Sequence, residues 1–193
     1  MPKPSATTSK SPVAESKTKP MPQKMLDSAT NQKEIKAHIN PSDLPKVSVI
    51  TVVYNGSDHI IQTMDSVINQ TYPYIEYILI DGASSDNTRS IIESKITHLA
   101  PTIKLDNTKK DNPNNTIKSY YLEASYITSH KRIDFKFLSE PDSGIYDAMN
   151  KGIDLASGEW CNFMNCGDRF YANDTIYELF MRFLMMQKGG GQL

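Results

Sequence analysis

Acidic and amide side chains follow three apolar runs of the sequence, each at the point where the run ends. The three clusters are Asp81 with Asp86, Glu140 with Asp142, and Asn165 with Asp168. If the runs are parallel strands, the clusters meet at the edge where such sheets bind ligands. An edge rich in carboxylates and poor in histidine suits Mg²⁺ or Mn²⁺, which complete their shells with diphosphate oxygens. One such cluster alone is typical of a turn or helix cap, but three in register favour a site.

The first apolar run ends in Val53-Tyr54-Asn55-Gly56, which offers an aromatic ring and an amide at the same edge. These groups suit stacking on a nucleobase and hydrogen bonding to it, and the segment equally fits a tyrosine that closes a core strand. The sequence has no GxxxxGK[ST] loop, no GxGxxG after this run and no GxSxG elbow. It therefore argues against P-loop, dinucleotide and serine-hydrolase sites.

Alternating strand and helix patterns position these clusters. Val47 to Val53 is a nearly continuous β-rich run typical of a buried strand, and Ile75 to Ile80 predicts a second one. Ser57 is the expected N-cap of the helix between them. The expected apolar faces are Ile60, Ile61, Met64, Val67 and Ile68 in this helix, and Ile91, Ile92, Ile96 and Leu99 in the next. The β-α-β-α order predicts a mostly parallel, doubly wound sheet flanked by helices.

The stretch 100–132 is the least periodic part of the ordered sequence. Asp106 to Asn115 is polar throughout, so we interpret 100–132 as an insertion in the domain. Within it, Tyr120 to Thr128 fits a short helix. Ile133 to Leu138 then predicts a strand that leads into the second acidic cluster.

The clearest helix signal lies between two Ser-Gly pairs, a start signal at 143–144 and a stop signal at 157–158. The apolar face of this helix comprises Ile145, Ala148, Met149, Ile153 and Ala156. Glu159 to Met164 predicts a short, buried parallel strand. A last helix is expected from Asp174 to Gln187, and its apolar face suits the sheet or a membrane surface. That face comprises Ile176, Leu179, Phe180, Phe183 and Leu184.

Composition and charge limit the class of protein. Residues 1–46 contain few large apolar residues, which predicts a disordered tail before a domain over 47–187; a second tail covers 188–193. The net charge of −1 gives no argument for nucleic acid as a partner. The two cysteines and four scattered histidines form no disulfide framework or metal-ligand spacing, and packed thiols are expected. Without a membrane-spanning run or signal-peptide core, we expect a cytoplasmic protein, with contact at the inner membrane face as an option.

Four ordered segments resemble the family 2 glycosyltransferases with the GT-A fold, and they look most like the bacterial polysaccharide-assembly branch. The segments are VSVITVVYNG (47–56), YILIDGASSDNT (77–88), SEPDSGIYDAMNKGI (139–153) and SGEWCNFMNCGD (157–168). The match covers roughly Val47 to Glu178. The resemblance implies a Rossmann-like sheet and transfer of a hexosyl or N-acetylhexosaminyl group. The donor would be a UDP- or GDP-linked sugar, and the acceptor a glycan or a lipid-linked molecule.

The resemblance also implies roles for individual positions. Those that would contact the nucleotide are Val53, Tyr54, Asn55, Asp81 and Asp86. Those on the donor-sugar side are Asp142, Asp147, Asn150 and Lys151. Residues 165–168 occupy the place of the Asp-x-Asp metal motif, so Asp168, with Asn165, would hold Mn²⁺ or Mg²⁺ on the donor diphosphate. An asparagine at the first position predicts a weaker metal affinity than two carboxylates would give.

The implied reaction is displacement at the anomeric carbon of the donor, with inversion. A cation at Asp168 would stabilise the charge that develops on the diphosphate, and a carboxylate base would deprotonate the acceptor hydroxyl. In the family this base lies beyond the metal motif, and no catalytic base can be named in 1–193. Two functions therefore stay open: a transferase, and a truncated, non-catalytic fragment that binds a nucleotide-sugar. A GT-A-like nucleotidyltransferase is less favoured, because no basic glycine-rich loop follows the first run.

Overall fold

The computed structural model describes residues 44–100, 102–105 and 119–189. The predicted tail over 1–46 lies outside the described residues as far as residue 43, and so do residues 190–193 of the second predicted tail. Leu44 is already buried in the core, so the ordered domain begins before the predicted first strand.

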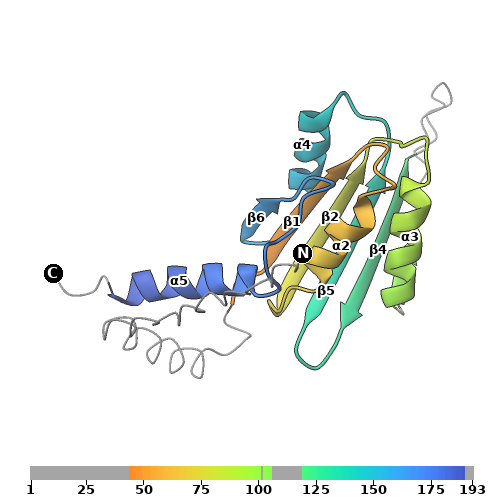
Figure 1. The fold of residues 1–193 in the computed structure, drawn as a ribbon. Coiled ribbons are helices and arrows are strands. Elements are labelled where there is room, and N and C mark those ends of the chain that lie inside the picture. Colours follow the sequence, from red (N-terminus) through yellow and green to blue (C-terminus); the bar gives the residue numbers. More distant parts are fainter. Residues whose placement is uncertain (1–43, 101, 106–118, 190–193) are drawn as a thin grey trace, which may run out of the picture. The chain divides into compact units, whose positions relative to one another are not determined.

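In the described residues, a six-stranded sheet has the order β3-β4-β5-β2-β1-β6 (Figure 1). The strands are β1 (Val47–Val53), β2 (Tyr74–Asp81), β3 (Thr102–Leu105), β4 (Tyr120–Ile127), β5 (Arg132–Ser139) and β6 (Trp160–Phe163). β1 pairs parallel with β2 and β6, and β2 pairs parallel with β5, whereas β4 is antiparallel to β5 and β3. The prediction of a mostly parallel α/β sheet is confirmed.

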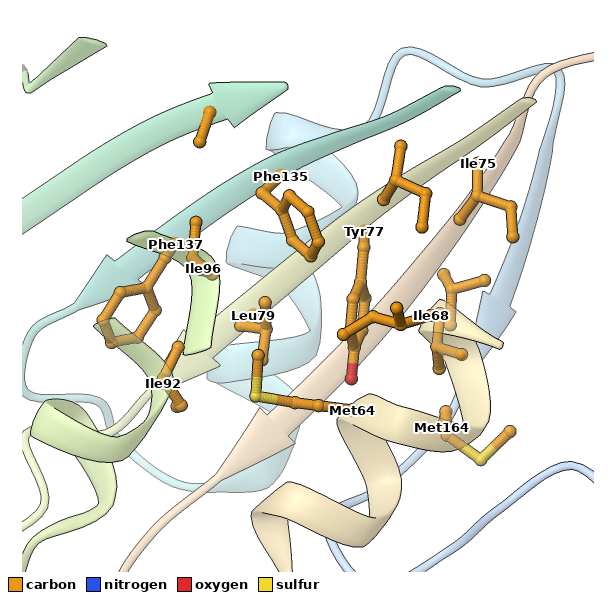
Figure 2. Packing of buried hydrophobic residues seen from close by; sticks show 14 of the residues in the cluster. Met64, Ile68, Ile75, Tyr77, Leu79, Ile92, Ile96, Phe135, Phe137 and Met164 are labelled. Carbon is orange, nitrogen blue, oxygen red and sulfur yellow. The ribbon is translucent and has the colours of Figure 1, made fainter. Parts of the chain in front are cut away.

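Helices cover both faces of the sheet (Figure 1). They are α2 (Ile60–Ile68), α3 (Thr88–Leu99), α4 (Ile145–Leu155) and α5 (Thr175–Gly189). On one face, Met64 of α2 and Ile92 of α3 belong to a buried cluster with Tyr77 and Phe137 of the sheet (Figure 2). On the other face, Ala148 of α4 is buried in a smaller cluster with Ile50, Val52, Ile78 and Ile80. The central strands are therefore covered on both sides, which explains why their sequences are nearly continuous runs of apolar residues.

The strand registers bring the predicted site segments to one edge of the sheet. Val53 pairs with Asp81, and Asp81 pairs with Ser139 on the next strand, so three carboxyl ends lie in one row. β6 is shorter, but the chain continues along β1, because the N–H of Cys166 donates to the carbonyl of Val52 at 3.2 Å. The three acidic clusters therefore meet at the carboxyl edge, as predicted.

Residues 120–127 form a strand, and the prediction of a short helix there is wrong. β4 alternates buried Tyr120, Leu122 and Ala124 with half-buried Tyr121 and Glu123, which is the period of a strand with one covered face. Its antiparallel pairing with β5 supplies the hydrogen bonds that decide the conformation. Within the predicted insertion 100–132, β3 and β4 belong to the sheet. Residues 106–118 lie outside the described part.

β6 is parallel to β1, as predicted, but it is not buried. All four of its side chains are exposed, because it is the outermost strand of the sheet within the described residues. Trp160 packs edge-on against Phe180 and Phe183 of α5, with ring centroids 5.6 and 5.3 Å apart. A short apolar run predicts a strand but does not reveal whether a neighbour covers it.

Two helices differ from prediction in their details. α2 begins after His59, without a side-chain cap, so Ser57 is not its N-cap, and Ile61 is 37% exposed. In α4, Ile145 is 50% exposed and Ile153 is 47% exposed. The buried residues of α4 are the small Ala148 and Gly152, and these allow a close approach to β1.

α5 packs on the core at its beginning, through buried Ile176 and Phe180. Leu179 is 63% exposed and Phe183 is 38% exposed, so only part of the predicted apolar face is covered. The side chain of Leu184 lies outside the described residues. No helix in the described part of the chain is long and apolar enough to cross a membrane.

Candidate functional site

Two turns at the carboxyl edge, residues 54–57 after β1 and residues 82–88 after β2, are joined by hydrogen bonds. Three successive backbone N–H groups of the first turn donate to side chains of the second. The pairs are Asn55 to Ser84 Oγ at 2.8 Å, Gly56 to Thr88 Oγ1 at 2.8 Å, and Ser57 to Asp86 Oδ2 at 3.2 Å. In many nucleotide-binding folds, N–H groups at this place hold phosphate. Here the protein itself already uses these donors.

Asp81, the last residue of β2, is fully buried, and two serines hold its carboxylate. Ser139 Oγ donates to Oδ2 at 2.7 Å. The Ser84 hydroxyl donates to Oδ1, and the Ser84 N–H lies 3.2 Å from both oxygens. Because the Ser84 proton is directed to Asp81, a lone pair on its Oγ accepts the N–H of Asn55. Asp81 therefore fixes the two turns relative to the sheet.

Asp86 is exposed, and its carboxylate binds the beginning of α3. Its Oδ1 accepts hydrogen bonds from the Thr88 hydroxyl at 2.5 Å and the Thr88 N–H at 2.9 Å. The bond from the Thr88 hydroxyl is the main reason that the pKa of Asp86 is lowered to about 2, and the backbone N–H groups of Thr88 and Ser57 add to it. The side chain thus stays ionised at neutral pH and already has three donors.

A cavity of about 520 Å³ opens at this edge, on the face of the sheet that carries α4. It is lined by Val52, Val53, Tyr54, Gly82, Pro141, Asp142, Gly144, Ile145 and Ala148. Tyr54 is 66% exposed, so its ring is available to a ligand. Asp142 is oriented by the N–H of Gly144, which donates to its Oδ1 at 2.9 Å. A Cβ at position 82 would clash with the carboxylate of Asp142, so a larger residue there would require the Asp142 side chain to move.

Lys151 connects the turn after β5 to α4. Its Nζ lies 3.0 Å from Glu140 Oε1 and 3.5 Å from Asp147 Oδ2, and it donates to the carbonyl of Pro141 at 2.8 Å. Asp147 also accepts the N–H of Ser143 at 2.9 Å; this bond, followed by Lys151, lowers the pKa of Asp147. These contacts hold the cavity wall that carries Asp142.

The turn after β6 carries the predicted metal residues. Asp168 is exposed, and its N–H donates to the carbonyl of Asn165 at 2.9 Å. Gly167, with a φ of 98°, donates its N–H to Thr63 Oγ1 at 2.9 Å, which fixes the turn on α2. Asn165 Oδ1 is buried and has no hydrogen-bond partner in the described part of the protein.

The donor set of this turn fits a cation that arrives with a ligand. Among the described residues, no three His, Cys, Asp or Glu side chains gather into a metal cluster. Mg²⁺ is usually bound in nucleotide sites by one or two carboxylates, with phosphate and water oxygens completing the shell. Asp168 supplies one exposed carboxylate of this kind, and the unpartnered amide oxygen of Asn165 lies in the same turn.

Cys166, in the same turn, is packed against the first turn. Its Sγ lies 3.7 Å from the carbonyl of Gly56, and a Cβ on Gly56 would come within 2.6 Å of it. Burial raises the pKa of the Cys166 thiol, and the charges of Asp86 and Asp168 raise it further. The expectation of a packed thiol is therefore met at Cys166, whereas Cys161 on β6 is exposed.

The predicted site residues fall into four groups in the structure. Those that line the cavity are Val53, Tyr54 and Asp142. Those that build the joined turns are Asn55, Asp81 and Asp86. Those on α4, none of which lines the cavity, are Asp147, Asn150 and Lys151. Asn165 and Asp168 lie in the turn after β6 and do not line it either. The hydroxyls of Ser84, Thr88 and Ser139 were not predicted as site residues; Ser139 ends β5, and Ser84 and Thr88 lie between the end of β2 and the beginning of α3.

A second cavity, of about 340 Å³, lies at the opposite end of the sheet around buried Glu76. Charged residues of both signs line it, but they pair with one another. Glu76 lies 3.3 Å from Lys46 and 2.8 Å from Lys136, and Arg132 lies 2.9 Å from Asp134. Because these groups already satisfy each other, this cluster supports the fold and offers little to a ligand.

Comparisons with known proteins agree with this geometry. Residues 48–116 match the family described as glycosyl transferase family 2. A PGL/p-HBAD biosynthesis glycosyltransferase of Mycobacterium bovis is 28% identical over 132 residues, which are 68% of this chain and 39% of the relative. A putative teichuronic acid biosynthesis glycosyltransferase of Bacillus subtilis is 29% identical over 126 residues, 65% of this chain and 37% of the relative. This chain therefore spans well under half the length of these curated relatives.

A solved structure shares the fold. A mannosyltransferase from Pyrobaculum calidifontis, in complex with GDP-Man and Mn²⁺, has a TM-score of 0.52 and 20% identity. The likeness covers 81% of this chain and 39% of that one. The family match over residues 48–116 and the two relatives therefore make this part of the chain similar to glycosyl transferase family 2, and the solved structure shows a shared fold.

Proposed function

We propose that this chain binds a nucleotide-diphosphate sugar at the carboxyl edge of its sheet. Its function would be transfer of the sugar, with inversion, to a glycan or lipid-linked acceptor. The observation that carries the proposal is the cavity of about 520 Å³ at this edge, with an exposed tyrosine ring at its rim. A cavity with an aromatic wall and few polar groups suits a nucleoside. The match of residues 48–116 to the glycosyl transferase family 2 supports the sugar diphosphate as the remainder of the ligand.

The nucleoside side of the ligand would lie against Tyr54 and Val53. Both residues line the cavity, and the Tyr54 ring is exposed enough to stack on a base. Asn55, Asp81 and Asp86 would act mainly by holding the turn that carries Tyr54, because their side-chain oxygens already accept hydrogen bonds within the protein. The donor sugar would lie toward Asp142, with Asp147, Asn150 and Lys151 behind it on α4.

The diphosphate requires a cation in this proposal. The three N–H groups of residues 55–57 are already used by Ser84, Thr88 and Asp86 and cannot receive phosphate oxygens. Asp168, with Asn165, would instead hold Mn²⁺ or Mg²⁺. Once bound, the cation would neutralise charge that develops on the leaving diphosphate.

A second candidate function is binding of the nucleotide-sugar without transfer. Each carboxylate beside the cavity already has a partner: Asp142 binds the Gly144 N–H, Glu140 binds Lys151, and Asp147 binds both Ser143 and Lys151. None of them is placed as a free general base. Assay of sugar release and transfer separates this candidate from the first. Cytoplasmic location and contact with a membrane face stay predictions under both.

Replacing Asp168 with alanine should abolish the metal-dependent part of nucleotide binding. In isothermal titration calorimetry with Mn²⁺, the wild-type chain should bind UDP or GDP, and Asp168→Ala should weaken that binding on the order of 10- to 100-fold. With EDTA, wild type and variant should bind equally weakly, because the carboxylate then has no cation to hold.

Asp154→Ala is the matched control, since Asp154 is an exposed aspartate of α4 away from the cavity lining. It removes the same charge and should leave the titration unchanged. A folded wild-type chain that binds neither nucleotide would exclude the proposed donor site. Binding that does not respond to Asp168→Ala would exclude the metal role of this turn.

A further inference from the structure

We propose that Ser139 is a positioning residue for the nucleoside side of the site. It acts through the carboxylate of Asp81, and the proposal rests on the nucleotide-sugar function proposed above. Ser139 ends β5, is 4% exposed and pairs in register with Asp81. Its hydroxyl donates to Asp81 Oδ2 at 2.7 Å. It therefore reaches the site from a strand that the cavity itself does not touch.

A continuous chain of hydrogen bonds leads from Ser139 to the cavity wall. Asp81 accepts the Ser139 hydroxyl on one oxygen and the Ser84 hydroxyl on the other. Ser84 Oγ in turn accepts the N–H of Asn55 at 2.8 Å, and Asn55 follows Tyr54 directly. Each hydroxyl has one proton, so the direction of every bond is set by the carboxylate. Without the bond from Ser139, the carboxylate of Asp81 is free to rotate. The position of Tyr54 then changes, because it depends on the orientation of that carboxylate.

The burial of this network indicates that it has a role beyond packing. Asp81 is 0% exposed, so its carboxylate needs hydrogen-bond partners inside the protein. An apolar residue at the same position of the sheet would need none. The turns that it holds include two non-glycine residues in the left-handed region, Asn55 with a φ of 49° and Ala83 with a φ of 57°. A non-glycine residue keeps this left-handed backbone conformation only where neighbouring hydrogen bonds stabilise it. The network supplies those bonds at the turn beside Tyr54.

The same network does not hold the predicted cation turn. The backbone bonds that fix that turn come from outside the network, from Cys166 N–H to the carbonyl of Val52 and from Gly167 N–H to Thr63 Oγ1, and its contact with the first turn is the packing of Cys166 against Gly56. The two halves of the site therefore separate experimentally. A change at Ser139 should affect recognition of the nucleoside and leave recognition of the diphosphate intact. A purely structural role would weaken both alike.

The test is calorimetry of the full chain with Mn²⁺ and three probes: UDP, GDP and inorganic pyrophosphate. Ser139→Ala should weaken the nucleotide that wild type binds best by about tenfold, the usual effect of losing a hydrogen bond to a charged group. Pyrophosphate affinity should stay within about twofold. Ser139→Thr, which keeps the hydroxyl, should restore nucleotide binding.

Ser125→Ala is the matched control, because Ser125 Oγ also donates to an aspartate at 2.7 Å, Asp134, but at the far end of the sheet. It should change neither affinity. If Ser139→Ala does not fold, Ser84→Ala removes the other hydroxyl on Asp81 from a surface turn and should give the same selective loss. Equal loss for nucleotide and pyrophosphate, or no loss at all, overturns the proposal. A wild-type chain that binds no nucleotide overturns the proposed function as well.

Discussion

Replacing Glu76 with glutamine should destabilise the folded chain by about 3 kcal/mol at pH 7, because it removes the charge that two lysines share inside the protein. Glu76 is 1% exposed. Its carboxylate lies 2.8 Å from Lys136 and 3.3 Å from Lys46, and Ser48 and Ser157 donate hydroxyls to it at 2.6 Å each. Breaking such a buried pair from one side leaves the lysines without their counter-ion.

The loss should depend on pH in a definite direction. Burial alone would raise the pKa of Glu76, but the bonds from Lys136, Ser157 and Ser48 outweigh it and lower the pKa from 4.5 to about 2. The unfolded chain therefore takes up the proton first as pH falls. The stabilisation is complete above about pH 4.5 and is lost as pH decreases toward 2. The difference between wild type and Glu76→Gln should shrink over the same window.

Urea unfolding at pH 7, 4.5 and 3 measures this difference. Asp65→Asn provides the contrast, since Asp65 pairs with Lys95 at 2.6 Å between α2 and α3 but is 41% exposed. That surface pair should contribute less than about 1 kcal/mol. Equal effects of the two substitutions, or a Glu76→Gln effect that does not change with pH, would contradict the assignment.

Replacing Gly152 with valine should destabilise the chain by about 3 kcal/mol, because no space remains between α4 and β1. A Cβ on Gly152 would clash with Cγ2 of Ile50, which is 0% exposed at the centre of β1. Helix propensity alone would slightly favour valine over glycine, so a loss of stability would be caused by the clash. α4 must then move away from the sheet. Since Ile145 and Ala148 of α4 line the cavity, ligand binding should weaken too.

Chemical denaturation of three variants tests this packing. Asp154→Val places the same residue at an exposed position of α4 and should change stability by less than about 0.5 kcal/mol. Combining Gly152→Val with Ile50→Ala opens room for the valine and should cost less than the sum of the two single changes. Strict additivity in this cycle would show that the two residues do not compete for space.

The central sheet was predictable because its residues carry strong, local signals. Val47–Val53 is a strand over the predicted residues, and the predicted helix near 145–156 forms as α4. β4 was not predictable from its own residues, because its conformation depends on pairing with β5. The exposure of β6 depends on which neighbours lie beside it. Neither property is encoded in a short window of sequence.

The location of the candidate site at the carboxyl edge could be predicted from the sequence, but the role of each residue within it could not. Motifs at strand ends placed Tyr54, Asp81 and Asp142 at one edge, and the registers bring them there. That Asp81 is enclosed by Ser84 and Ser139 follows from the pairing of β2 with β5, which no local pattern reveals. Serines in turns follow no periodic pattern, so their hydrogen-bond partners can be identified only when the register of the strands is known.

The joined turns at 54–57 and 82–88 have a thermodynamic consequence for any anionic ligand. The three N–H groups of residues 55–57 already donate to a serine, a threonine and an aspartate, so this turn has none of these donors left for a diphosphate. If the proposed site binds a cation and a nucleotide together, linkage requires each to raise the affinity of the other by the same factor. The concentration of free divalent metal would thereby set how much nucleotide-sugar the protein holds.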